Sequence, residues 1–178
     1  MKKVATFLAI AGACTVVVST SAFAMGSGNI YVDTQVGVTY TVYQPTVTTG
    51  LKLTSKSNLA LPCASGAAEE NLATKYGTKT QILSLTEGNP MCSDIGQGAT
   101  VLTTKVQGAT AKVQAYCDPA LSLKCTVADV SKFGGHLDVK LPAIKGLRPT
   151  RVWIETTGKT PLSAQQLVTI AKGLQPVQ

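Results

Sequence analysis

The sequence of 178 residues is poor in the residue types on which most enzyme and metal sites depend. It has one histidine, one tryptophan and nine acidic residues. The lone histidine, His136, excludes a metal site built on several histidines, and no G-x-S-x-G motif accompanies it to suggest a Ser-His-Asp triad. Walker and G-x-G-x-x-G nucleotide motifs are also missing. We therefore predict a protein that is not an enzyme, with no catalytic residues, no metal and no cofactor.

Long hydrophobic runs are missing as well, except at the N-terminus. There, two lysines precede the apolar stretch VATFLAIAGACTVVV, and Ala22-Phe23-Ala24 forms the small-x-small pattern that signal peptidase cleaves. The stretch is short for a transmembrane helix, which needs about 20 apolar residues. A lipoprotein attached through Cys14 is the less favoured alternative, because the apolar run continues past that cysteine. We predict a signal peptide over 1–24.

The rest of the chain, 25–178, is then one exported domain without a transmembrane segment, located in the periplasm, the cell wall or outside the cell. Its length is typical of a single domain that can bury its own core. The full chain carries a net charge of +7, which falls to about +5 when Lys2 and Lys3 leave with the signal peptide. The basic residues are scattered rather than clustered, which disfavours nucleic acid as a partner and leaves a weak attraction to anionic cell-surface polymers.

Four cysteines remain after processing, and an even number in an exported chain predicts two disulfide bonds. Their spacing is not that of a zinc site. Three pairings are open, and we favour Cys117–Cys125 because the segment CDPALSLKC is a loop whose ends can meet. That choice leaves Cys63 to pair with Cys92.

Alternation of apolar and polar residues dominates the middle of the chain and predicts β-strands. The segment 31–45 is rich in Val, Thr and Tyr, and we expect it to be a strand that ends at Pro45. Further strands are expected over 50–61, in hairpins that turn at Gly77-Thr78 and at Gln107-Gly108, and over 136–142. A helix over 67–75 is an alternative to the first strand of the Gly77 hairpin. The segment 126–134 predicts a short helix that begins at Thr126 and ends at Gly134.

The C-terminal segment RVWIETTGKTPLSAQQLVTIAKGL reads as a strand, a turn and an amphipathic helix. Ser163 and Gln166 fit a capping box at the start of the helix. The apolar positions of the helix follow the helical period, at Leu167, Ile170, Ala171 and Leu174. We expect this helix to pack on the side of the strand that carries Val152 and Ile154, leaving Trp153 on the other side.

These motifs resemble a family of extracytoplasmic bacterial domains of unknown function, found in the C-terminal regions of anti-sigma factors and in small exported proteins. The resemblance rests on Pro45 to Gly50, the hairpin at Gly108, the strand with Trp153, and the closing helix pattern Leu162, Ser163, Leu167, Ile170 and Ala171. It implies an α+β fold. Specifically, it implies a single antiparallel, curved β-sheet, with the C-terminal helix and a short second helix packed on one face.

The sequence thus predicts a non-catalytic binding or sensory domain for an unknown envelope ligand or protein. One alternative is a carrier of a hydrophobic or lipid ligand, held in an apolar cavity. A second is a structural or inhibitory protein that acts through surface interactions. A lone tryptophan among charged neighbours suits the floor of a groove, because it offers apolar area and a polar N–H together. The predicted ligand surface comprises Trp153, Arg151, Glu155, Tyr40 and Tyr116.

Overall fold

The structure is a computed structural model that describes residues 26–61, 69–90, 98–117, 125–144 and 146–177. The predicted signal peptide and the pair Cys63 and Cys92 lie outside these residues. The elements follow one another along the chain as α1 (Ile30–Gln35), β1 (Tyr43–Pro45), β2 (Leu53–Leu61), β3 (Glu69–Gly77), β4 (Gln81–Gly88), β5 (Ala99–Val106), β6 (Ala109–Ala115), a 3-10 turn η2 (Val127–Asp129), α2 (Val130–Phe133), β7 (Gly135–Leu141), β8 (Thr150–Gly158), α3 (Ala164–Lys172) and β9 (Leu174–Pro176).

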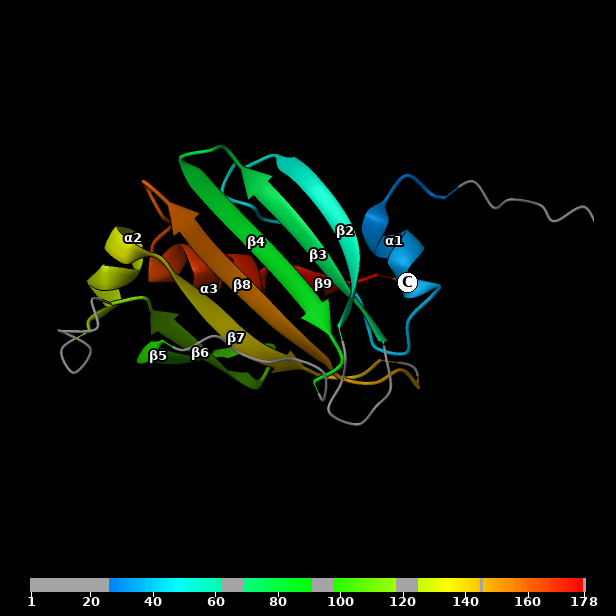
Figure 1. Cartoon of the computed structure of the whole chain (residues 1–178). Helices are drawn as coiled ribbons and strands as arrows, with labels where there is room; N and C mark the ends of the chain where they lie inside the picture. Colours follow the sequence, from blue (N-terminus) through cyan, green and yellow to red (C-terminus); the bar gives the residue numbers. More distant parts are fainter. Residues whose placement is uncertain (1–25, 62–68, 91–97, 118–124, 145, 178) are drawn as a thin grey trace, which may run out of the picture.

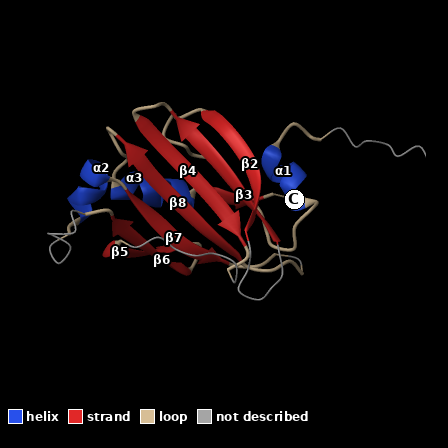
Figure 2. Cartoon of the chain, in the orientation of Figure 1, coloured by secondary structure: helices blue, strands red, loops and turns tan. Residues whose placement is uncertain are grey.

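Antiparallel sheet is the main component of the fold, accompanied by a few helices, as an α+β protein requires (Figures 1 and 2). Seven strands form one sheet in the order β2-β3-β4-β8-β7-β6-β5. The expectation of a single sheet is wrong, because β1 and β9 pair with each other in a separate two-stranded sheet. The order also brings the last long strand, β8, between β4 and β7 in the middle of the seven-stranded sheet.

Helix α3 lies behind the large sheet in Figure 1 and covers one of its faces. Its apolar residues Leu167 and Ile170 are fully buried in one cluster with Val152 and Ile154 of β8, as the alternation predicted. The same cluster takes in Leu137 and other inward residues of β4 to β7. We call this side of the sheet the covered face and the opposite side the open face.

The start of α3 confirms the predicted capping box. The Ser163 hydroxyl accepts a hydrogen bond from the Gln166 N–H, and the Gln166 side chain accepts one from the Ser163 N–H at 2.8 Å. These two bonds satisfy backbone donors that the first turn of a helix otherwise leaves unpaired. Helix α3 therefore begins where its sequence indicates.

The short second helix also forms where it was expected. The carboxylate of Asp129 accepts hydrogen bonds from the Thr126 N–H at 2.7 Å and the Thr126 hydroxyl at 2.9 Å. Val130 is buried in the cluster under α3, and Gly134 ends the helix with a φ of 86°, which favours glycine. This segment therefore joins the covered side of the sheet.

Both predicted hairpins are present. Strands β3 and β4 flank the turn after Gly77, and β5 and β6 flank Gln107-Gly108. The alternative helix over 67–75 is wrong, because the chain is extended from Glu69 to Gly77 and pairs on both sides with β2 and β4. Strand β3 thus gains two ladders of backbone hydrogen bonds, which outweigh the helix propensity of its Ala and Glu residues.

The expected N-terminal strand over 31–45 is wrong for most of its length. Ile30–Gln35 is a helix, and only Tyr43–Pro45 is a strand. The Asn29 side chain accepts a hydrogen bond from the Tyr31 N–H at 3.0 Å and caps the helix. The Tyr31 hydroxyl then bonds to the hydroxyls of Thr74 at 2.9 Å and of Tyr76. Contacts with a strand more than 40 residues away therefore stabilise α1 against the β-propensity of its residues.

No helix of the described ranges is both long enough and apolar enough to cross a membrane. The longest, α3, has nine residues.

Candidate functional site

The open face of the sheet carries side chains in rows that cross four strands. The tryptophan row holds, from β6 to β4, Lys112, Asp138, Trp153 and Thr86. The histidine row beside it holds Gln114, His136, Glu155 and Ser84. The arginine row on the other side holds Thr110, Lys140, Arg151 and Gly88, in the register that Ala111 and Val139 set for β6 and β7. Within the described ranges, no helix or strand crosses this face (Figure 1).

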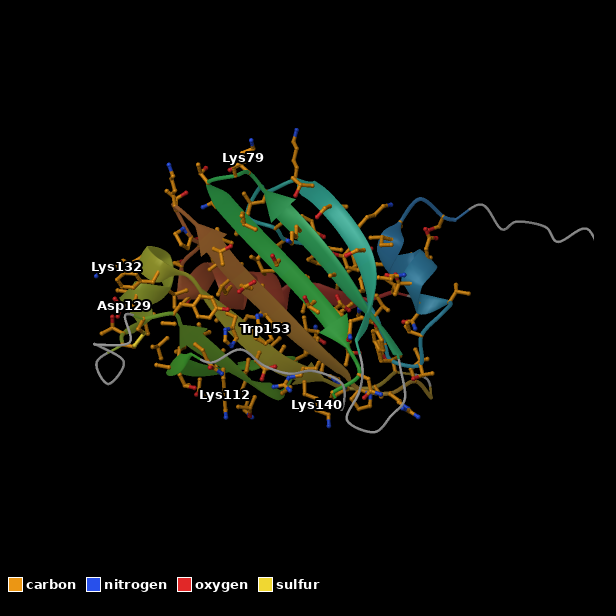
Figure 3. The ribbon with its side chains drawn as sticks, viewed as in Figure 1. Lys79, Lys112, Asp129, Lys132, Lys140 and Trp153 are labelled. Carbon is orange, nitrogen blue, oxygen red and sulfur yellow. A yellow bond between two sulfur atoms is a disulfide. The ribbon has the colours of Figure 1, made fainter. Side chains whose placement is uncertain are left out.

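Trp153 stands at the centre of these rows and is partly exposed (Figure 3). The His136 ring stacks against one face of the indole, with centroids 4.3 Å apart and planes inclined by 30°. Tyr116 packs on His136 in turn, at a centroid distance of 5.6 Å. One side of the indole is therefore supported by two further rings, and the indole as a whole stays partly exposed.

Hydrogen bonds fix the supporting rings. The Tyr116 hydroxyl donates to Glu155 Oε1 at 2.7 Å and lies 3.3 Å from His136 Nδ1. Because its proton points to Glu155, the phenol oxygen must accept from His136 Nδ1–H. His136 Nε2 is then an acceptor, and it is buried without a hydrogen-bond partner among the described residues. A buried acceptor without a partner costs about 1–3 kcal/mol of folding stability, so His136 at this position destabilises the fold by that amount.

A second polar pair lies on the other side of Trp153. The Arg151 guanidinium donates to both oxygens of Asp138, from Nε at 2.7 Å and from Nη2 at 2.9 Å. Both side chains are mostly buried, with 21% and 18% of their surfaces exposed. The paired, planar geometry holds Arg151 in one orientation beside the indole.

Burial and hydrogen bonds determine the protonation states of His136 and Tyr116 on this face. Burial lowers the pKa of His136 to about 4, with Asp138 opposing the shift and Arg151 adding to it, so the imidazole is neutral at pH 7. Burial and the hydrogen bond to Glu155 raise the pKa of Tyr116 well above its usual value, so its phenol stays protonated. The carboxylates of Asp138 and Glu155 are each engaged by a neighbour. Burial and hydrogen bonds thus hold these rings and charged groups in defined orientations.

A surface pocket of about 390 Å³ opens in the arginine row, next to Trp153. The residues that line it are Pro90, Thr110, Lys112, Asp138, Val139, Lys140 and Arg151. Three of these side chains are cations and one is a carboxylate, which leaves a net charge of +2 around the pocket. A site at this position favours an anionic group.

The covered face contains a different polar cluster, under the N-terminal segment. Glu87 is buried there, and its Oε2 accepts from the Tyr43 N–H at 2.7 Å, while Oε1 has no hydrogen-bond partner within the described ranges. Burial raises the pKa of Glu87 to about 8, against the lowering effect of the Tyr43 N–H, so the carboxyl is protonated at neutral pH. Because the cluster is enclosed, we treat it as part of the core and not as a binding site.

Four of the five residues predicted for the ligand surface lie together, and one does not. Trp153, Arg151, Glu155 and Tyr116 share the open face. Tyr40 was wrongly included, because it is fully buried beneath the covered face, where its hydroxyl donates to the Glu87 carbonyl at 3.3 Å. Tyr40 belongs to the segment 31–45, which was expected to be a strand and forms one only over Tyr43–Pro45.

The sequence analysis did not predict that Asp138, Lys140 and Lys112 belong to the site. It also did not predict that His136 supports the ring of Trp153. The alternation His136, Asp138, Lys140 along β7 was a usable signal that these side chains share a face. The pattern does not show which strands lie beside β7, so it could not place these side chains next to Trp153 and Arg151 of β8. Of the predicted disulfides, Cys117–Cys125 is present with Cα atoms 6.1 Å apart, and Cys63–Cys92 lies outside the described residues.

No group of three or more metal-ligating side chains is assembled within the ranges that the structure describes. Searches against protein-family models, curated proteins and solved structures found no match to this chain.

Proposed function

We propose that this chain is an exported, non-catalytic binding domain of the bacterial cell envelope, and that its ligand contacts the open face around Trp153. One observation carries the proposal. The only tryptophan is partly exposed on a sheet face, where His136 and Tyr116 support one side of its ring. Rigid aromatic rings surrounded by oriented polar groups are typical of ligand-binding surfaces.

The packing of the covered face favours this proposal over a lipid carrier. A carrier would hold its ligand in an apolar cavity between the sheet and its covering elements. Here the side chains of α3 occupy that position, and Leu167 and Ile170 are fully buried in one cluster with the sheet, as is Leu174 of β9. A lipid could enter only by displacing the helix, whereas a ligand of the open face needs no such change.

Two observations support export. The sequence pattern of 1–24 is that of a signal peptide, and the Cys117–Cys125 bond suits an oxidising compartment. The family that the motifs resemble is extracytoplasmic, which would place this chain in the same setting. Thiol titration of the purified mature protein under denaturing, non-reducing conditions should find no free thiol. Two or more reactive thiols would contradict the predicted disulfides.

Tryptophan fluorescence tests the binding surface directly, because Trp153 is the only tryptophan. We expect acrylamide to quench the emission and a ligand found among glycans, lipids or envelope extracts to protect it. Trp153→Ala should abolish binding of that ligand, whereas Trp153→Phe, which keeps an aromatic ring, should retain part of it. An indole that acrylamide cannot quench and that responds to none of these candidates would rule out the surface.

A further inference from the structure

The pocket beside Trp153 contains two lysines that have no anionic partner in the part of the chain that the structure describes. Lys112 lies directly across from Asp138 in the tryptophan row, the usual place for an ion pair. The Asp138 carboxylate, however, accepts from Arg151 through both oxygens. Lys112 and Lys140 therefore have no ion-pair partner among the described residues, although both line the pocket.

The arginine row concentrates positive charge further. Lys140 lies directly across from Arg151, and like charges at such positions destabilise a sheet. Lys105 follows on β5, where its ammonium donates to the Thr110 hydroxyl at 2.7 Å. Because the Thr110 oxygen accepts that bond, its own O–H is free to donate into the pocket. An anion bound here would meet two ammonium groups and a hydroxyl and would relieve the repulsion between Lys140 and Arg151.

The distance between the pocket and Trp153 indicates how far the anionic group of a ligand would lie from a ring on the indole. Trp153 lies two strands from Lys112 in the same row, a separation of about 10 Å at the usual strand spacing. His136 belongs to the row on one side of Trp153, and Lys140 and Arg151 to the row on the other. A ligand could thus pack a ring on the exposed part of the indole and extend an anionic group into the pocket.

We propose that the open face binds an acidic polysaccharide, with a sugar ring on Trp153 and the carboxylate or phosphate of the chain held by Lys112, Lys140 and Thr110. The inference rests on the proposed function and specifies its ligand class. Sugar rings present C–H groups to an aromatic ring and hydroxyls to polar side chains. The polar side chains near Trp153 that could bond to such hydroxyls are those of Thr86, Ser84, Gln114 and Glu155.

The same face is poorly suited to a membrane. Binding to a lipid surface requires apolar side chains that project into the bilayer, in addition to basic residues. Five large hydrophobic residues are exposed among those described, and none lies in the three rows: Val36, Val47, Leu53, Val127 and Phe133. Trp153 is only partly exposed and supported by His136, so it cannot extend outward as an anchor.

The test compares charged and neutral forms of one sugar chain. Hexagalacturonate, its methyl ester and a phosphorylated mannan oligosaccharide are titrated against the mature protein, with Trp153 fluorescence and calorimetry as readouts. We expect one or both anionic chains to bind about 10-fold or more tighter than the methyl ester, since hydrogen bonds to a charged group are stronger than hydrogen bonds between neutral groups. The tighter of the two identifies carboxylate or phosphate as the preferred anion, and salt should weaken either complex.

Two pairs of substitutions that remove equal charge locate the anion. Lys112→Gln with Lys140→Gln should weaken binding about 10-fold, as expected for the loss of two ionic contacts at exposed side chains. Lys75→Gln with Lys79→Gln is the matched control, because these lysines line a separate pocket around Tyr76 and Gly77. It should change affinity less than about 2-fold. Thermal unfolding of each variant verifies that the fold is intact.

The possible failures can be told apart. Equal losses in both lysine pairs, or none in the first, would overturn the anion site while leaving the Trp153 surface in place. Binding that depends on Lys112 and Lys140 but survives Trp153→Ala would keep the anion site and refute the proposed tryptophan surface. Tighter binding of oligothymidylate than of either acidic sugar would replace the polysaccharide with a nucleic acid.

Discussion

The two ends of the covered face are filled in different ways. Beneath α3, the sheet presents apolar side chains such as Val139 and Ile154, which pack against Leu167 and Ile170. Beneath the N-terminal segment, the same face presents Thr74, Tyr76 and Glu87, which bond to Tyr31 and Tyr43. The first end depends on hydrophobic burial, which is insensitive to pH. The second depends on hydrogen bonds between buried polar groups, each of which is costly when it loses its partner.

The largest effect is expected at the apolar end. Leu167→Ala or Ile170→Ala should each lower the free energy of unfolding by about 2–5 kcal/mol, because each leaves a cavity in a fully buried cluster. Urea denaturation measures this loss. Gln165→Ala, on the exposed side of α3, is the control and should change stability by less than about 0.5 kcal/mol. Small effects at both buried positions would show that the helix does not form the core.

At the polar end, Glu87 should make stability depend on pH. Its pKa is raised from 4.5 to about 8 in the folded protein, so the folded state binds a proton more tightly than the unfolded state does. The stabilisation is complete below pH 4.5 and is lost as the pH rises through about 8. Glu87 contributes a slope of about 1.4 kcal/mol per pH unit in between. His136, whose pKa is lowered from 6.5 to about 4, contributes the opposite slope below pH 6.5, so the net loss of stability is expected above that pH.

Glu87→Gln should remove that slope, because the amide mimics the protonated carboxyl and does not titrate. Denaturation at pH 5, 6, 7 and 8 is the measurement, with the same substitution at Glu155 on the open face as the control. The phenols that face Glu87, those of Tyr31, Tyr43 and Tyr76, have raised pKa values and stay neutral over this range. An unchanged slope in Glu87→Gln would assign the pH dependence to other groups.

A smaller loss is expected at the hydroxyl that joins α1 to the sheet. Tyr31→Phe should cost about 1–3 kcal/mol, because the buried hydroxyls of Thr74 and Tyr76 lose a shared partner. Faster hydrogen exchange in Ile30–Gln35 than in α3 would show that the loss is local. If the variant is as stable as the parent, the hydroxyl contacts do not hold the helix.

The smallest effect concerns the cap of α3. Ser163→Ala should lower stability by about 1 kcal/mol, whereas Ser163→Asn, which can still cap, should stay near the parent. Equal losses in the two variants would mean that the side chain contributes through packing and not through the bond to Gln166 N–H.

The elements that could be predicted are those whose signals lie close together in the sequence. The capping box of Ser163 and the helical period of Leu167 and Ile170 specify α3 within a dozen residues. Alternation along β8 placed Trp153 on the face opposite Val152, and the structure agrees. Local hydrogen bonds and periodic apolar residues act over this same range, so one sequence was enough to find them.

The sequence by itself determined the hairpins, the closing helix and which face of β8 holds Trp153. Tertiary structure decided the remainder. It made 30–35 a helix, because Tyr31 bonds to β3, and it placed Tyr40 in the core. It also set β7 between β8 and β6, which brings Lys112 and Lys140 into the rows of Trp153 and Arg151. Strand order depends on contacts between residues far apart in the chain, and alternation within one strand carries no information about which strand lies beside it.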